Sequence, residues 1–161
     1  MSQEQQQTAQ QQTGESQVPA LYNPTIALAL SLVFTPIFGG ILHALNWKEL
    51  GNDALFARNM TWVRWTFYCF ICYTFLEPIF QTLPFGRYMM IALLVGFWLA
   101  WATSLGLSQV LYVRDFVPAY VHKMWGKAIM AGALGWVGYT TVSLTITLIL
   151  QVSGLQPIPT P

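Results

Sequence analysis

An uncharged apolar segment near the end of the sequence constrains the fold most. Residues 128–150, AIMAGALGWVGYTTVSLTITLIL, contain no charged side chain, and a helix of about 23 residues rises roughly 35 Å. That length suffices to cross the hydrocarbon core of a bilayer, which is about 30 Å thick. Three further apolar segments, at about 25–45, 62–83 and 88–113, have comparable lengths. The sequence therefore predicts an all-α, polytopic membrane protein with four transmembrane helices in a small bundle.

The composition favours the same class and excludes several others. Charged residues make up 8% of the chain and hydrophobic residues 55%, whereas soluble domains carry about 25% charged residues. The net charge of +1 gives no basic patch for nucleic acid. With two His and two Cys in the chain, ligands for a metal or haem are scarce, and no cluster of acidic, His or Cys residues suggests catalysis. We therefore expect no cofactor, no nucleic-acid partner and no enzymatic activity.

Composition also divides the chain into three parts. Residues 1–22 are rich in Gln, Ser and Thr and have few apolar side chains, which predicts a disordered tail because little surface can be buried. Residues 23–152 contain the four expected spans. Residues 153–161 contain regularly spaced Pro and are expected to be an extended tail.

The distribution of basic residues predicts an orientation in the membrane. Six of them lie in or beside the loops that follow the first and third spans: Lys48, Arg58, Arg64, Arg114, Lys123 and Lys127. On the other side, the turn at 84–87 has only Arg87 and the two tails have none. Because cytoplasmic loops carry an excess of Lys and Arg, we expect these two loops in the cytoplasm and both termini outside it.

The first expected span is interrupted in its middle. Thr35-Pro36 and the pair Gly39 and Gly40 lie within it, so we expect a kink or a locally thin helix there. After it, Asn46 and Glu49 have the spacing of a capping box, and Asn52 is expected to cap the next helix.

Two ionisable residues are associated with the second span and the turn after it. Glu77 is the only acidic residue inside an expected span, and intramembrane carboxylates often handle ions or protons. Arg87 is expected at the same membrane level across the short turn, so a structural ion pair or a solvated interfacial position is the alternative. His43 is expected at the opposite end of the bundle, with no ionisable side chain between it and Glu77. A proton path is therefore poorly supported.

Cys69 and Cys72 have the C-x-x-C spacing of redox and metal sites. Both are expected in the middle of a span among apolar side chains, which raise the pKa of a thiol and leave it inert. No second pair of ligands completes a tetrahedral zinc site. We therefore interpret the two cysteines as structural.

Small residues in the last span predict a helix-packing face. Gly132, Gly135 and Gly138 recur every three residues, which lets another helix approach closely, and the Thr and Ser residues that follow could bond across helices. Gly39 and Gly40 offer a similar surface in the first span. The partner of this face is open: another span, a second copy of the chain, or another protein.

Residues 22–65 resemble the opening of a group of small multi-pass proteins of the bacterial inner membrane. The resemblance rests on Tyr22-Asn23-Pro24, on the run FTPIFGGILHALNW from Phe34 to Trp47, and on Leu50-Gly51. Some members of that group resemble immunity proteins against pore-forming toxins that type VI secretion delivers. The resemblance implies location in the inner membrane and a non-enzymatic role, and it supplies no catalytic residues.

The leading hypothesis is a protein that binds another membrane-inserting polypeptide, most concretely a pore-forming toxin that it neutralises. Such a protein would trap a toxin helix laterally, through the small-residue face, before a pore assembles. The alternative is a small transporter or channel subunit built around Glu77 and the interrupted first span.

Overall fold

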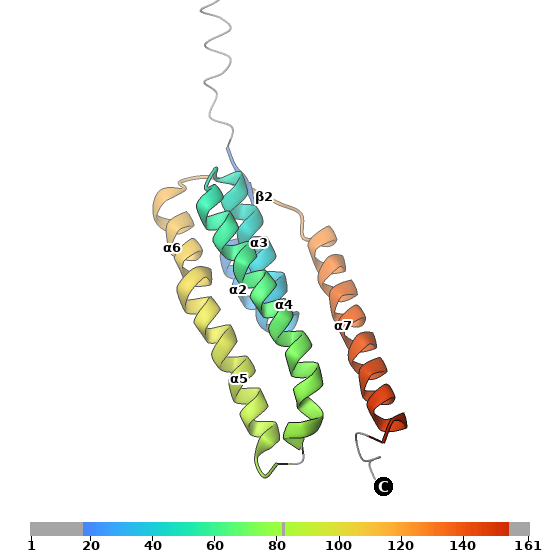
Figure 1. The fold of residues 1–161 in the computed structure, drawn as a ribbon. Helices are drawn as coiled ribbons and strands as arrows, with labels where there is room; N and C mark the ends of the chain where they lie inside the picture. Colours follow the sequence, from blue (N-terminus) through green and yellow to red (C-terminus); the bar gives the residue numbers. More distant parts are fainter. Residues whose placement is uncertain (1–17, 82, 155–161) are drawn as a thin grey trace, which may run out of the picture.

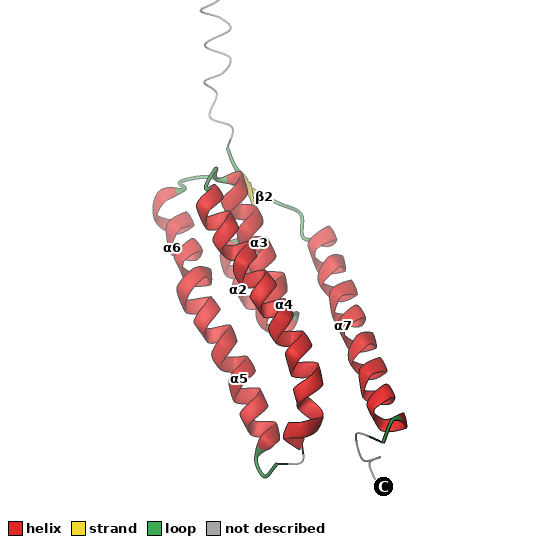
Figure 2. Ribbon diagram, in the orientation of Figure 1, coloured by secondary structure: helices red, strands yellow, loops and turns green. Residues whose placement is uncertain are grey.

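The computed structural model describes residues 18–81 and 83–154. The elements in chain order are β1 (Ala20–Leu21), α2 (Pro24–Val33), α3 (Pro36–Glu49), α4 (Asp53–Gln81), α5 (Gly86–Trp101), the π-helix η1 (Ala102–Gly106), α6 (Leu107–Phe116), β2 (Val121–His122) and α7 (Gly126–Val152). Figure 1 shows long helices that run side by side, and Figure 2 shows that helix makes up nearly all of the described chain. The prediction of an all-α fold is confirmed.

Two helical stretches of the described chain are long and apolar enough to cross a membrane. They are Gly86–Phe116, with 31 residues, and Gly126–Val152, with 27, and they contain the segments predicted at 88–113 and 128–150. Helix α4 is similarly long, with 29 residues, but it does not meet the same criterion of apolar composition. The two stretches weakly indicate membrane association, and four transmembrane helices are not confirmed.

The prediction of one kinked helix over 25–45 is wrong, because the chain reverses between α2 and α3. Thr35 is extended, with φ −177° and ψ 162°, since the ring of Pro36 disfavours a helical residue before it. The Thr35 hydroxyl then accepts the N–H of Phe38 at 3.2 Å and starts a new helix. A Cβ on Gly39 would lie 2.5 Å from the Cβ of Ser31, whereas eight residues of straight helix span about 12 Å. Helices α2 and α3 therefore form a hairpin.

Both ends of this hairpin lie at the same end of the molecule. The Asn46 side chain joins them, because its Oδ1 accepts the N–H of Tyr22 at 2.9 Å and its Nδ2 donates to the Tyr22 carbonyl at 2.7 Å. The strand before the hairpin, β1, pairs in parallel with β2, in the register Ala20 with Val121 and Leu21 with His122.

The hairpin places the two described ends of the chain at opposite ends of the helices, while the side of a membrane on which each terminus lies stays a prediction. Figure 1 shows β1 at one end of the helices and the last turn of α7 at the other. Of the predicted tails, residues 1–17 and 155–161 lie outside the described residues, while the segment at 20–21 forms β1 and Leu21 is fully buried.

The turn between α3 and α4 follows ordinary capping rules. Gly51 has φ +70°, a conformation that glycine adopts without strain, and its N–H bonds to the Lys48 carbonyl at 3.1 Å. The Asn52 side chain accepts the N–H of Leu55 at 3.0 Å, which confirms the predicted cap of α4. The predicted Asn46 cap is wrong, because Asn46 lies inside α3 and its side chain bonds outside that helix.

The helical stretch that runs from α5 through η1 to α6 contains a π-bulge where it meets the hairpin. Segment η1 joins α5 to α6 without a break, and a π-bulge displaces backbone carbonyls from their usual partners. Hydroxyls bond back to two of these carbonyls: Thr103 Oγ1 donates to Leu99 O at 2.8 Å and Ser104 Oγ to Ala100 O at 2.6 Å. The bulge brings Gly106 against Leu28 of α2, where a Cβ on the glycine would lie only 2.8 Å from Leu28 Cδ1.

The buried residues gather around the hairpin. One cluster joins Ala27, Phe38 and Leu42 to Ala128 of α7, and the other consists of Trp101, Ala102 and Leu105. We call this end of the bundle, where α2 and α3 pack beside the start of α4, the end of α5 from Trp98, η1, α6 and the first turns of α7, the hairpin half. At the other end, among the described residues, the later part of α4, the start of α5 and the later part of α7 continue (Figure 1). We call it the open half.

Candidate functional site

The small-residue strip of α7 divides between the two halves. Gly132 is buried, and a Cβ there would lie 3.0 Å from the rings of Phe34 and Phe38. A Cβ on Gly135 or on Gly138 would have no neighbour within 4 Å. The strip therefore contacts the chain's own hairpin at its first glycine and faces outward at the other two.

The rest of α7 is exposed over most of its surface. Its large side chains that reach the surface include Leu134, Val137, Leu144, Leu148 and Ile149. In the open half it touches α4 through Tyr139, whose ring centroid lies 5.3 Å from that of Phe70. The exposed face is thus broad, apolar and marked by two glycines.

Three threonine hydroxyls of α7 bond within the helix, whereas the Tyr139 hydroxyl lies 3.5 Å from that of Thr74 in α4. Thr140 donates to Trp136 O, Thr141 to Val137 O and Thr145 to Thr141 O, each at 2.8 to 2.9 Å. This back-bonding satisfies hydroxyls that would otherwise face apolar surroundings. The expected bonds across helices are not formed by these three residues.

Gly39 and Gly40 lie inside the hairpin half. A Cβ on Gly39 would meet Ser31 at 2.5 Å and Trp101 at 2.8 Å, and a Cβ on Gly40 would meet Val63 at 2.9 Å. Both glycines allow α3 to approach its own neighbours. They present no surface to a partner.

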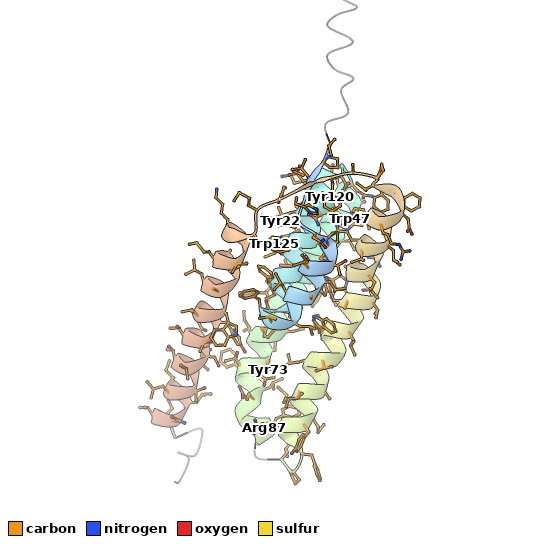
Figure 3. All side chains as sticks on the ribbon, turned by 180° about the vertical axis from the view of Figure 1, so that it is seen from behind. Tyr22, Trp47, Tyr73, Arg87, Tyr120 and Trp125 are labelled. Carbon is orange, nitrogen blue, oxygen red and sulfur yellow. The ribbon has the colours of Figure 1, made fainter. Side chains whose placement is uncertain are left out.

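Glu77 and Arg87 line one cavity at the tip of the open half. The cavity has a volume of about 720 Å³, and Tyr73 and Tyr88 also line it. Figure 3 shows Tyr73 on the open half of α4 and Arg87 at the end of the α4–α5 pair. The structure therefore places the acidic and the basic residue beside the same cavity.

Cys69 and Cys72 are free thiols that line a second, apolar cavity of about 680 Å³. Within residues 18–81 and 83–154, no three His, Cys, Asp or Glu side chains are grouped as a metal ion would require. The two cysteines therefore form part of an apolar wall among Phe, Leu and Tyr side chains.

His43 is fully buried in the hairpin half, far along the chain from Glu77. Its ring lies edge-on to that of Trp101, with centroids 5.5 Å apart. It packs beside the polar cluster described next, at the end of the bundle opposite Glu77.

The sequence did not reveal a cluster of buried polar side chains that joins the hairpin to α6. Asn46 Nδ2 also donates to Gln109 Oε1 at 3.2 Å, and Gln109 Nε2 donates to the His43 carbonyl at 2.8 Å. Asn46 and Gln109 are both fully buried. The available signal was an amide side chain in each of two apolar segments, because a buried polar group needs a partner.

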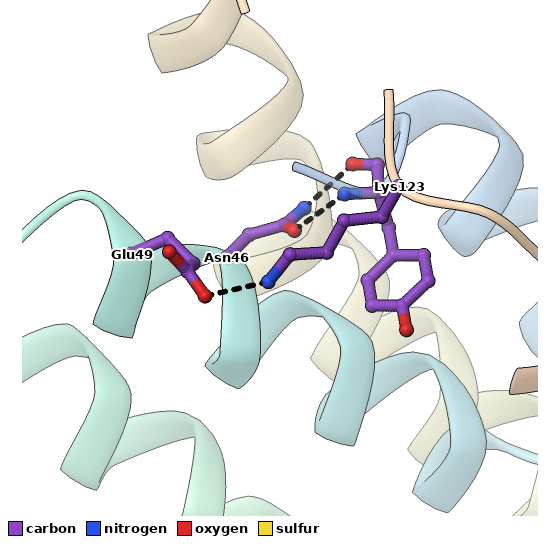
Figure 4. A network of polar contacts seen from close by, with 4 residues as sticks. Asn46, Glu49 and Lys123 are labelled. Carbon is purple, nitrogen blue, oxygen red and sulfur yellow. Dashed lines mark hydrogen bonds and ion pairs between the residues drawn. The ribbon is translucent and has the colours of Figure 1, made fainter. Parts of the chain in front are cut away.

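The loop end of the hairpin half carries charged and aromatic contacts. Lys123 donates to Glu49 at 2.6 Å and lies over the Tyr22 ring, 5.7 Å from its centroid. Figure 4 shows this ion pair beside the two hydrogen bonds of Asn46. Figure 3 shows Tyr22 and Trp125 close together, with ring centroids 5.3 Å apart. This end therefore joins the start of the fold to the loop before α7.

Comparison with models of protein families, with curated proteins and with solved structures finds no match to this chain. The resemblance of residues 22–65 to small inner-membrane proteins therefore stays a prediction from the sequence.

Proposed function

We propose that this chain is a non-enzymatic, multi-pass protein of the bacterial inner membrane that binds a membrane-inserted helix of another polypeptide. Its most concrete form is immunity to a pore-forming toxin. The observation that carries the proposal is the outward face of α7, where Gly135 and Gly138 meet no other part of the described chain. Small residues on a lipid-facing surface allow close helix approach.

The binding mechanism is lateral. A toxin helix in the bilayer gains dispersion contacts when it packs on a face with two glycines and long apolar side chains beside them. A toxin helix bound to α7 is no longer free to assemble with other toxin helices into a pore. A second copy of this chain could use the same face, and self-association is then the competing outcome.

The proposal includes a membrane arrangement. In it, α4, the α5–α6 stretch and α7 cross the bilayer, while the α2–α3 hairpin enters and leaves on one side. The basic loop residues such as Lys48, Lys123 and Lys127 belong to the end where the hairpin begins and ends. By the excess of Lys and Arg in cytoplasmic loops, that end and the chain's first described residues face the cytoplasm, and the end of α7 faces outward.

The transporter alternative has weaker support from the geometry. Glu77 lines a cavity at one end of the bundle. The cavity that continues towards the hairpin is lined mainly by apolar side chains such as Phe70, Leu76 and Leu94, which offer an ion no ligands. Beyond it, Trp98 and Trp101 pack against the hairpin.

A protection assay tests the proposal. The chain is co-expressed with pore-forming toxins of the same cell, and depolarisation of the inner membrane is measured. We expect Gly135→Leu and Gly138→Leu to keep normal membrane abundance and to lose most of the protection, because the bulky side chains hold a toxin helix away.

Gly96→Leu is the matched control, because Gly96 also lies on an exposed helix face with no neighbour within 4 Å of a Cβ. It should protect as the unmodified chain does. Equal protection by the Gly135, Gly138 and Gly96 variants would contradict binding through α7. Crosslinking of α7 to a second copy in the absence of toxin would show instead that the face serves self-association.

A further inference from the structure

The open half contains two cavities that share a wall. The charged cavity of about 720 Å³ and the apolar cavity of about 680 Å³ are both lined by Tyr73, Phe80 and Met90. They therefore adjoin along α4 and α5. A ligand that fills both must be polar at one end and apolar along the rest.

The outer cavity offers groups of opposite charge. Glu77 from α4 and Arg87 from α5 line it together with the phenols of Tyr73 and Tyr88. An arginine binds a phosphate through directed, charge-assisted hydrogen bonds, and a carboxylate accepts hydrogen bonds from an ammonium group at several sites. These two groups together match a zwitterion that carries a phosphate and a primary ammonium.

The inner cavity is an apolar slot that runs towards the hairpin. Along α4 its walls extend from Phe80 to Thr66, a length of about 21 Å at roughly 1.5 Å per residue. At its inner end the Trp98 indole N–H is bonded to the Ser31 hydroxyl at 2.9 Å. That polar group is therefore satisfied by the protein, and the slot suits a long hydrocarbon chain.

We propose that the two cavities together bind one phospholipid of the phosphatidylethanolamine type. Its phosphate lies at Arg87, its ammonium at Glu77, and one acyl chain lies in the apolar slot between α4, α5 and α7. Contacts that Glu77 makes within the protein are compatible with this arrangement, because a carboxylate has room for several donors.

Other occupants match the two cavities less well. A fatty acid offers no cation to Glu77, and phosphatidylglycerol likewise lacks an ammonium group. An apolar helix offers nothing to Glu77 or Arg87. Free phosphate leaves the apolar slot unfilled. The site is separate from the outward face of α7, so its failure and the failure of the proposed function are distinguishable.

Native mass spectrometry of the full-length protein in detergent tests the proposal. Phosphatidylethanolamine, phosphatidylglycerol and oleic acid are added in separate titrations, and the bound fraction is measured. We expect one molecule of phosphatidylethanolamine to bind with at least about tenfold preference over the other two, a difference of roughly 1.4 kcal/mol.

Three variants and a control sharpen the result. Arg87→Gln should weaken binding of both phospholipids about tenfold, and Glu77→Gln should remove the preference for phosphatidylethanolamine. Leu94→Trp, which narrows the apolar slot, should weaken all three ligands alike. Arg58→Gln removes the same charge from an exposed position outside both cavities and should change nothing.

Two results would overturn the proposal. One is equal binding of the three ligands to the unmodified protein. The other is equal behaviour of Arg87→Gln and Arg58→Gln, which would show that the headgroup does not lie at Arg87. If Arg87→Gln fails to fold, Glu77→Gln still tests the proposal. Its readout is the preference for phosphatidylethanolamine over phosphatidylglycerol, and both ligands are measured on the same variant.

Discussion

The hairpin half and the open half are built from the same kinds of residue and packed in opposite ways. In the hairpin half, Trp47, Trp101, His43, Asn46 and Gln109 are all fully buried. In the open half, large apolar side chains such as Phe75, Leu93 and Leu144 are exposed by 54%, 62% and 65%. Glycines have opposite roles in the two halves. Gly39 permits close contact within the chain, whereas Gly135 leaves a surface on which another polypeptide could pack.

The contrast suggests that the two halves have different roles. The hairpin half is stabilised by buried hydrogen bonds and by two aromatic-rich clusters, so it can position α4, α5 and α7. The open half has cavities and exposed apolar surface between and around those helices. Both of our proposals place their ligands there, and a loosened hairpin half should disturb both indirectly.

The largest expected effect concerns topology, because the hairpin places the two described ends of the chain at opposite ends of the bundle. A reporter fused before Val18 should report the cytoplasm, and one fused after Pro161 the outer compartment. A fusion inserted at Asn52 should agree with the first. Identical readings from both termini would contradict a membrane hairpin and restore four crossings.

Gly39→Leu should break the hairpin half. The Cβ alone would meet Ser31 at 2.5 Å and Trp101 at 2.8 Å, and overpacking of this kind costs about 3 kcal/mol or more when the backbone must move. We expect a marked fall in membrane abundance and in the unfolding temperature in detergent. Gly96→Leu, in the open half, should leave both near normal. Comparable losses from the two variants would contradict the contrast between the halves.

Asn46→Leu tests the buried hydrogen bonds of Asn46 and has a smaller expected effect than Gly39→Leu. It removes the hydrogen bonds to the backbone of Tyr22 and to Gln109, and it leaves buried polar groups without partners, at a cost of about 3 kcal/mol. Detergent unfolding measures the loss. The double variant Asn46→Leu with Gln109→Leu should cost less than the sum of the two single variants, because both partners of one bond are then apolar. Strict additivity would show that the two amides do not act together.

Much of the helical framework could be predicted from local patterns. The apolar segments at 88–113 and 128–150 are helices because long uncharged runs favour them. Asn52 caps α4 because its side-chain oxygen reaches the first free N–H groups of the helix, and Pro36 ends α2 because its ring excludes helical geometry at Thr35. Each of these effects acts over a few residues, so the sequence is sufficient to place it.

The candidate sites were less accessible from the sequence. The spacing of Gly132, Gly135 and Gly138 predicted one continuous face, yet only the first of them packs within the chain. Glu77 and Arg87 were expected at one level, but nothing in the sequence indicated that the cavity they line adjoins an apolar slot. Cavities depend on how far apart the helices stand, and that separation is set by side chains distant in sequence.

The sequence by itself determined that this chain is helical, apolar and broken at Thr35, because propensity, capping and proline geometry are local. It could not decide whether the break bends a span or reverses it. The tertiary structure decided that point through contacts between distant residues: Asn46 bonds Tyr22 across 24 positions and Gln109 across 63, and Gly39 lies against Ser31 and Trp101. An amide side chain in an apolar segment has many possible hydrogen-bond partners, and only the folded chain selects one. The selection is strict because a buried polar group without a hydrogen bond costs much free energy.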